Sequence, residues 1–166
     1  MVQEPFRLRL WRQNGPPING RIFTCSRPGR SKGSAFRKIE DALVERWVNG
    51  LPSAERIIII SLLGRKPAGR SEFGFYSFRG GFDEPSDRPG CPTFQEWLDD
   101  RYGSGRYHVI EYPTVDLEPV PRRILDAVSE KVSSLLSTGQ TVVLVDSGGE
   151  SRTGQVCRFI GLRRCE

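Results

Sequence analysis

The sequence predicts an α/β fold in which a central, mainly parallel sheet is flanked by helices. Two segments, 56–63 and 141–145, are rich in β-branched residues and carry apolar side chains at nearly every position. Such runs are typical of strands that are buried on both faces of a sheet. Apolar residues recur at helical spacing over 35–48 and 120–136. Because predicted strands alternate with predicted helices, we expect long crossover connections and parallel pairing.

The predicted elements follow one another in a regular order along the chain. Strands are predicted at 6–11, 21–25, 56–63, 107–112 and 141–145. Helices are predicted at 35–48, 93–101, 120–136 and 152–162. Asn49-Gly50 ends the first helix, Thr93 with Glu96 forms a capping box at the start of the second, and Gly139 ends the third.

Length and composition indicate a single domain spanning 1–166, with an irregular insertion around 64–106. The chain has 166 residues, of which 37% are apolar and 27% charged, an ordinary balance for a globular domain. Within the insertion, 64–92 is rich in Gly, Pro, Ser and Arg with interspersed aromatic residues. This stretch is predicted to be a long functional loop or a small excursion from the core. Its arginines and aromatics suit either nucleic-acid binding or simple packing against the sheet.

The net charge favours some kinds of binding partner, and the hydropathy of the chain argues against a membrane span. The net charge is +5, which favours anionic partners such as phosphoesters, RNA or an anionic lipid surface. No apolar run approaches the roughly 20 residues of a membrane span, and the charged N-terminus lacks a signal region. We therefore predict a soluble, cytoplasmic protein with no transmembrane segment.

Cysteine and histidine usage does not favour a metal site. The four cysteines are Cys25, Cys91, Cys157 and Cys165, and no pair has C-x-x-C spacing. His108 is the single histidine and is predicted to be a structural residue of a strand. Cys157 is predicted to belong to the core, whereas Arg27 and Arg30 are expected to lower the pKa of Cys25. We expect reduced thiols, no metal and no cofactor.

The most informative segment is 142–154, Val-Val-Leu-Val-Asp-Ser-Gly-Gly-Glu-Ser-Arg-Thr-Gly. It predicts a buried strand, a glycine-containing loop and a helix, an arrangement that points several backbone N–H groups at one anion. The loop amides are those of Ser147, Gly148, Gly149, Glu150 and Ser151. Arg152 can hold a phosphate through its guanidinium fork, and Thr153 can bond the nucleophile or the leaving group. The alternative is a strand–turn–helix joint with an Asp or Ser helix cap.

This segment resembles the signature loop of the protein tyrosine and dual-specificity phosphatases, which reads His-Cys, five residues, Arg, Ser or Thr, and usually Gly. The residues that match in register are Arg152, Thr153, Gly154 and Gly149. Val145 stands at the histidine position and Asp146 at the position of the nucleophilic cysteine. The short tail after Gly154 departs from the family, which usually has further helices.

The resemblance implies a phosphotyrosine phosphatase-like fold and hydrolysis of phosphomonoesters through an enzyme-linked intermediate. The helix 120–136 and the early strand 21–25 also resemble elements of the family. Asp116, on a loop about thirty residues before the nucleophile position, falls where the family carries its general acid. Glu118 is a weaker substitute, and a surface carboxylate is the alternative for Asp116. The implied substrate is a phosphorylated protein or another phosphoester, such as a phosphoinositide or an RNA 5′ end.

An aspartate at the nucleophile position leaves several mechanisms open. Asp146 copies the charge of a thiolate but not its nucleophilicity. It can form an aspartyl phosphate, repel phosphate, or accept the N–H groups of its own loop and plug the site. A designed replacement of a natural cysteine is a further explanation. We therefore expect either an active phosphatase using Asp146, Arg152 and Asp116, or a non-catalytic pseudophosphatase or nucleic-acid-binding module.

Overall fold

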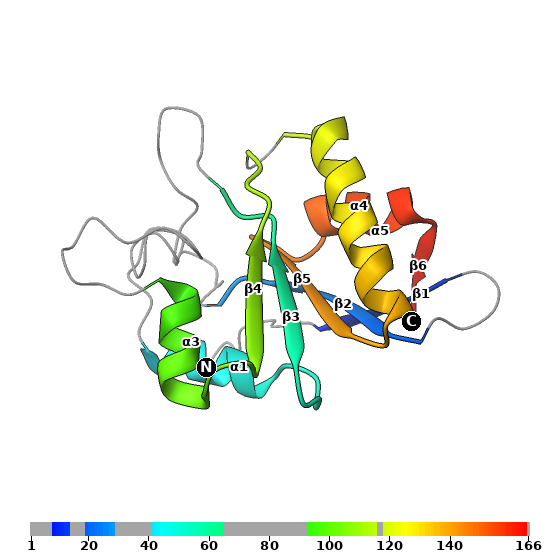
Figure 1. Cartoon of the computed structure of the whole chain (residues 1–166). Coiled ribbons are helices and arrows are strands. Elements are labelled where there is room, and N and C mark those ends of the chain that lie inside the picture. Colours follow the sequence, from blue (N-terminus) through cyan, green and yellow to red (C-terminus); the bar gives the residue numbers. More distant parts are fainter. Residues whose placement is uncertain (1–7, 14–18, 29–40, 65–92, 116–117, 166) are drawn as a thin grey trace.

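The computed structural model describes residues 8–13, 19–28, 41–64, 93–115 and 118–165 (Figure 1). The strands are β1 (Arg9–Gln13), β2 (Arg21–Ser26), β3 (Ile57–Ser61), β4 (Tyr107–Glu111), β5 (Thr141–Asp146) and β6 (Leu162–Arg164). The helices are α1 (Asp41–Asn49), α3 (Phe94–Tyr102), α4 (Arg122–Ser137) and α5 (Ser151–Ile160). The chain is therefore an α/β protein, as the alternation of patterns predicted.

One sheet of six strands runs through the molecule in the order β4-β3-β5-β2-β1-β6. The pairs β3–β4, β3–β5 and β2–β5 are parallel, whereas β1 is antiparallel to both β2 and β6. The prediction of a mainly parallel sheet is confirmed. β5 lies between β3 and β2, and all six of its residues are buried, which explains its uninterrupted apolar sequence.

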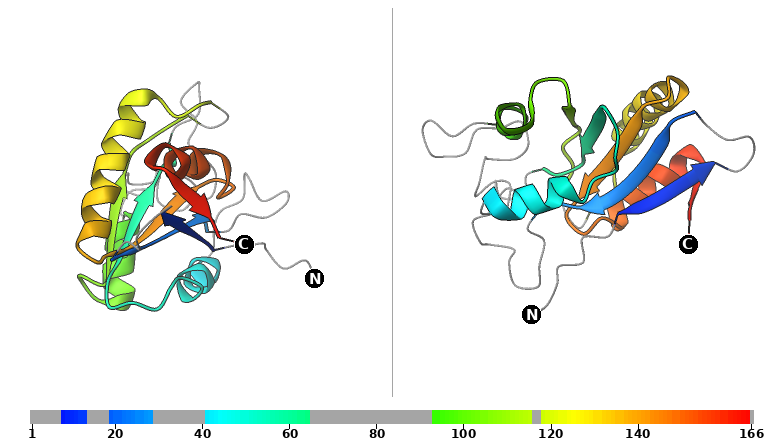
Figure 2. Two further views of the ribbon diagram at one scale, coloured as in Figure 1. Left: turned by 90° about the vertical axis from the view of Figure 1, so that its right-hand side faces the viewer. Right: turned by 90° about the horizontal axis from the view of Figure 1, so that it is seen from below.

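Helices cover both faces of the sheet, and the alternation of side chains along each strand feeds two apolar cores (Figure 2). On one face, α1 and α3 contribute residues such as Trp47 and Phe94, which pack with Ile59 and Val143. On the other face, α4 and α5 pack against Leu144 and its neighbours. No helix of the described residues is long and apolar enough to cross a membrane.

Most element boundaries agree with the sequence patterns. The capping box of α3 is present: Glu96 N donates to Thr93 Oγ1 and Thr93 N donates to Glu96 Oε1, each at 3.2 Å. Gly139 follows α4 with a φ of +78°, as a glycine that ends a helix does. The first helix is described from Asp41 onward, so the predicted start at residue 35 lies outside the described residues, as does 65–92.

The chain end corrects one prediction. The last helix was expected to reach Leu162, but α5 ends at Ile160 because Gly161 adopts a left-handed conformation with φ +93° and ψ 20°. Leu162–Arg164 then forms β6, an edge strand that pairs with β1. Because β1 pairs with β6, β1 extends to Gln13, two residues beyond the predicted end at residue 11. Three residues are too few for a periodic pattern, so the sequence carried no signal for this strand.

Candidate functional site

The carboxyl end of β5 lies at a point where the direction of the chain connections changes. Chain segments leaving β2 and β3 lead to α1 and α3 on one face, whereas β5 leads directly into α5 on the opposite face (Figures 1 and 2). Such a switch point, where neighbouring parallel strands continue to opposite faces, is the common position of ligand sites in open α/β sheets. The predicted loop 146–151 lies at this point.

Asp146 ends β5 with its carboxylate buried and turned back into its own loop. The residue is 1% exposed. Its Oδ1 accepts a hydrogen bond from Gly149 N, and its Oδ2 accepts one from Thr153 N at 2.9 Å. Both carboxylate oxygens therefore bind backbone amides of the loop and of the first turn of α5. Of the arrangements left open by the sequence, the structure has the one in which Asp146 accepts N–H groups of its own loop.

The hydrogen bond from Thr153 N to Asp146 also caps α5. Glu150, at the N-cap position, makes no side-chain capping bond. Thr153 is the third residue of the helix, whose N–H would otherwise lack a partner, and Asp146 supplies the acceptor from outside the helix. The carboxylate of Asp146 therefore lies at the N-terminus of α5, where the helix dipole favours a negative charge.

Gly149 makes the return of the loop possible. Its φ of +76° is rarely adopted by L side chains, and a Cβ at this position would lie 2.4 Å from Cys25 C and Ser26 N. The loop therefore passes directly over the end of β2. Gly148, by contrast, is exposed and has no neighbour within 4 Å of a Cβ, so its side chain position is open.

Arg152 is the second buried charge of the site, at 3% exposure. Its Nη1 donates to Leu62 O at 3.2 Å and to Thr114 Oγ1 at 3.0 Å. Thr114 Oγ1 in turn donates to Leu62 O at 2.5 Å. The guanidinium thus joins α5 to the segments that follow β3 and β4, and this predicted phosphate ligand also has a structural role.

Gln155 of α5 contacts the other end of the connection between β4 and α4. Val120 N donates to Gln155 Oε1 at 2.9 Å. α5 therefore contacts the connection between β4 and α4 at both ends, through Arg152 at Thr114 and through Gln155 at Val120. Asp116, the predicted general acid, belongs to this connection but lies outside the described residues.

The outer part of the loop faces solvent. Gly148, Glu150 and Ser151 are exposed. Within the described part of the chain, their backbone N–H groups donate no hydrogen bond. The Glu150 side chain turns away to an ion pair with Arg9. Ser147 is buried at 8% exposure. The predicted loop is therefore divided: Asp146 occupies the inner amides, and three outer amides remain open to water or a ligand.

Thr153 places a buried hydroxyl beside this site. The residue is 0% exposed, and its Oγ1 has no hydrogen-bond partner among the described residues. A buried hydroxyl without a partner loses the free energy of its hydration, so such groups are uncommon in folded proteins. Thr153 is the site residue that follows Arg152 in the predicted motif, and its backbone already serves Asp146.

The buried cysteines are not activated. Burial raises the pKa of the Cys25 thiol well above its ordinary value, and the nearby negative charge of Asp146 raises it further. The expected lowering of this pKa by neighbouring arginines was wrong, because desolvation outweighs them. Burial also raises the pKa of Cys157 to about 12. Cys157 is a core residue, as predicted, and neither thiol is a nucleophile near neutral pH.

Arg27 was missed as a residue of this region. It follows β2, is 1% exposed, and its backbone N donates to Asp146 O at 2.9 Å. Its Nη1 donates to Pro28 O at 3.1 Å. Arg27 therefore joins the chain after β2 to the end of β5 through its backbone. The available signal was its position at the carboxyl end of a strand parallel to β5.

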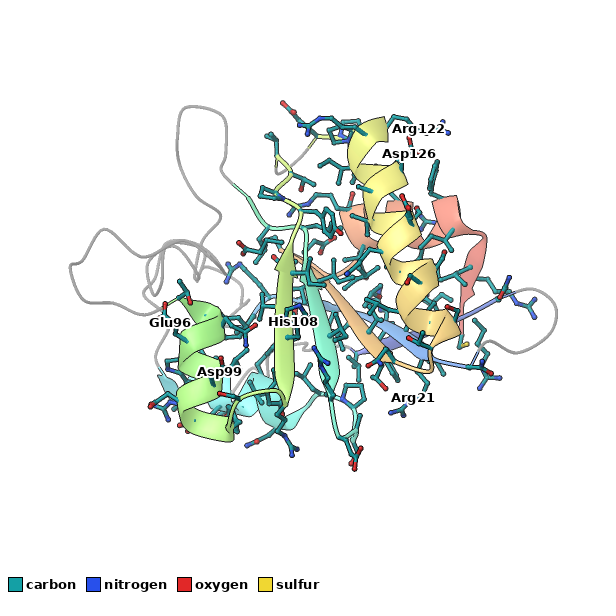
Figure 3. All side chains as sticks on the ribbon, in the orientation of Figure 1. Arg21, Glu96, Asp99, His108, Arg122 and Asp126 are labelled. Carbon is teal, nitrogen blue, oxygen red and sulfur yellow. The ribbon has the colours of Figure 1, made fainter. Side chains whose placement is uncertain are left out.

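Other predicted features lie elsewhere. His108 is exposed on the edge strand β4 (Figure 3), away from the β5 loop along the sheet order. Among the described residues, no three His, Cys, Asp or Glu side chains gather as metal ligands would. Comparisons with protein-family models, curated proteins and solved structures found no match to this chain.

Proposed function

We propose that this chain is a phosphatase-like domain that binds phosphoesters without hydrolysing them, with Asp146 as a built-in anion at the nucleophile position. The observation that carries the proposal is the pair of hydrogen bonds from Gly149 N and Thr153 N to the Asp146 carboxylate. Both amides belong to a strand–loop–helix segment that resembles the phosphatase signature loop. The carboxylate fills the place that a thiolate has in that family.

Binding is favoured over chemistry for two reasons. Both oxygens of Asp146 already accept a hydrogen bond from a backbone N–H group, which withdraws electron density and makes either oxygen a weaker nucleophile. In addition, two unit charges 4 Å apart repel each other by about 4 kcal/mol at an effective dielectric constant of 20. A phosphoester would therefore contact the outer amides of the loop, at Gly148, Glu150 and Ser151, with modest affinity.

Calorimetric titration with phenyl phosphate tests this proposal. We compare the wild-type protein with Asp146→Ala and with Glu150→Gln, which also removes one carboxylate from the loop but at its exposed side. Removing the inner charge is expected to tighten binding at least 10-fold, about a third of the full Coulomb term above, because solvent screens the rest. Glu150→Gln is expected to change the affinity less than 3-fold.

A third comparison tests the role of the guanidinium. Adding Arg152→Lys to Asp146→Ala keeps the positive charge but removes the planar fork, so the gain in affinity should be lost. Circular dichroism confirms that each variant is folded. Turnover of phenyl phosphate by the wild-type protein would show that the domain is a hydrolase instead. Absence of binding to every folded variant would show that the loop is only a structural joint.

A further inference from the structure

Positive charge is segregated in this fold. The strands β1, β2 and β6 and the helix α5 contain no Asp or Glu within their bounds, but they contain seven arginines. These are Arg9, Arg12, Arg21, Arg152, Arg158, Arg163 and Arg164. The helices α1, α3 and α4 instead carry both signs of charge. The excess of positive charge therefore gathers at the β1–β6 side of the sheet, next to α5 (Figures 1 and 2).

Four of these arginines are exposed on or beside the edge strand β6, and we call them the β6 surface: Arg12, Arg158, Arg163 and Arg164. Because side chains alternate along a strand, Arg163 and its partner Arg12 lie on one face of the sheet and Arg164 lies on the other. No carboxylate of the described residues forms an ion pair with any of them. Arg12 and Arg163 are direct cross-strand partners in the β1–β6 pairing. Like charges placed opposite each other destabilise a sheet, so this arrangement lowers stability unless an anion lies between them.

The β6 surface is connected to the loop of Asp146. Arg9, on β1, forms an ion pair with Glu150. β1 continues from Arg9 to Arg12, which lies opposite Arg163. α5 likewise runs from the loop, at Ser151, to the start of β6. The elements that carry Arg12 and Arg158 therefore both lead from the loop of Asp146 to β6.

We propose that the β6 surface binds the phosphodiester backbone of a nucleic-acid strand. Each arginine offers a planar fork of N–H donors that matches a phosphate, and the seven cations of this side include no lysine. Several such contacts in a row are the electrostatic footprint of backbone recognition, which carries little sequence preference. The inference goes beyond the phosphoester loop, because the surface lies outside it.

An anionic membrane is the other surface that arginines can bind, but the exposed side chains do not favour it. Peripheral membrane proteins usually add large apolar side chains that enter the bilayer interface. Among the described residues, Phe159 is the only large apolar side chain that is exposed, at 38%, and the Arg122 guanidinium lies over its ring. A nucleic-acid strand needs no such insertion.

Fluorescence anisotropy with a 20-nucleotide mixed-sequence RNA tests this inference. The test variant is the double substitution Arg12→Gln/Arg163→Gln, which removes the cross-strand pair of the β6 surface. The matched control is Arg122→Gln/Arg123→Gln, which removes two adjacent exposed arginines from α4 (Figure 3), on a helix that also carries acidic residues. Each lost phosphate contact should reduce the magnitude of the slope of log K against log salt concentration by about 0.7. The β6 double variant should therefore bind about 25-fold more weakly at 0.1 M salt.

The result that would overturn the inference is an equal loss of affinity in both double variants, which would indicate a response to net charge alone. Binding to vesicles containing phosphatidylserine, lost in the β6 variant while RNA is not bound by the wild type, would assign the surface to membranes instead. RNAs with a 5′-phosphate and a 5′-hydroxyl separate the two proposals. Equal affinity for both, with loss only in the β6 variant, supports the β6 surface whatever the loop binds.

Discussion

Replacement of Asp146 should lower the stability of the domain by an amount that follows from its two hydrogen bonds. In Asp146→Ala, the N–H groups of Gly149 and Thr153 lose their acceptor, and both residues are buried. A hydrogen bond to a charged group contributes about 1.5–3 kcal/mol. Relief of the buried charge offsets part of the loss. We expect a net decrease of about 3 kcal/mol in the free energy of unfolding.

The isosteric variant Asp146→Asn separates hydrogen bonding from shape. Asparagine keeps one acceptor oxygen but places an NH₂ group where the second oxygen was, so that it faces a backbone donor. The loss should be about 2 kcal/mol, smaller than for alanine but still well outside the range of an ordinary surface substitution.

Urea denaturation monitored by circular dichroism measures these changes. With a slope of about 2 kcal/mol per molar urea, a loss of 3 kcal/mol lowers the midpoint by about 1.5 M. A change below about 0.5 kcal/mol in both variants would refute the reasoning. It would mean that the carboxylate faces water and that the loop amides are satisfied in another way.

Three further predictions concern the loop glycines, the sheet edge and a buried thiol. Gly149→Ala should lower the free energy of unfolding by at least 3 kcal/mol, because it adds a left-handed alanine and a backbone collision, whereas Gly148→Ala should change it by less than about 0.5 kcal/mol. Gln95 donates to one backbone carbonyl of the edge strand β4 and accepts from one of its N–H groups, at 2.8 and 2.7 Å. Gln95→Ala should uncover this edge and cause concentration-dependent association in light scattering. Burial raises the pKa of Cys157 to about 12, so the folded state keeps its proton longer than the unfolded chain. The free energy of unfolding should therefore fall as pH rises above about 9, by up to about 1.4 kcal/mol per pH unit, and Cys157→Ser should remove that part of the slope. At pH 8, iodoacetamide should modify Cys165, which is partly exposed, but not Cys157.

Each of these predictions has a result that would contradict it. Equal stability of the two glycine variants would mean that the loop does not pass close to β2. A Gln95→Ala variant that stays monomeric at all concentrations would show that other features protect the edge. Rapid alkylation of Cys157 in the native protein, located by peptide mass spectrometry, would contradict its burial.

Patterns that depend on burial and local spacing were readable from the sequence. The apolar run of β5 predicted a central strand, and the Thr93–Glu96 pair predicted the start of α3, because both follow from short-range physics. The three-residue strand β6 was not readable, since its partner β1 lies about 150 residues earlier and its sequence has no period. Gly161, which separates it from α5, was the one available local signal.

The candidate site was only partly predictable for the same reason. The spacing of Asp146, Gly149 and Thr153 placed them on one strand–loop–helix segment, so their proximity followed from local geometry. The partners of Arg152 did not: Leu62 and Thr114 are 90 and 38 residues away in sequence. They meet α5 only because β4, β3 and β5 are successive parallel strands of the sheet. Predicting the contacts of Arg152 requires the order of the strands in the sheet, and no local sequence pattern gives that order.

The central claim is that Asp146 occupies the nucleophile position of a phosphatase-like loop. The most direct test is hydrolysis of a generic aryl phosphate by the wild-type protein, by Asp146→Cys, and by Asp146→Cys combined with Arg152→Ala. The account predicts no turnover by the wild type, a gain of activity in the cysteine variant, and its loss in the double variant. An inert cysteine variant that is folded and keeps the loop would contradict the claim, and the segment would then be a capped strand–helix joint.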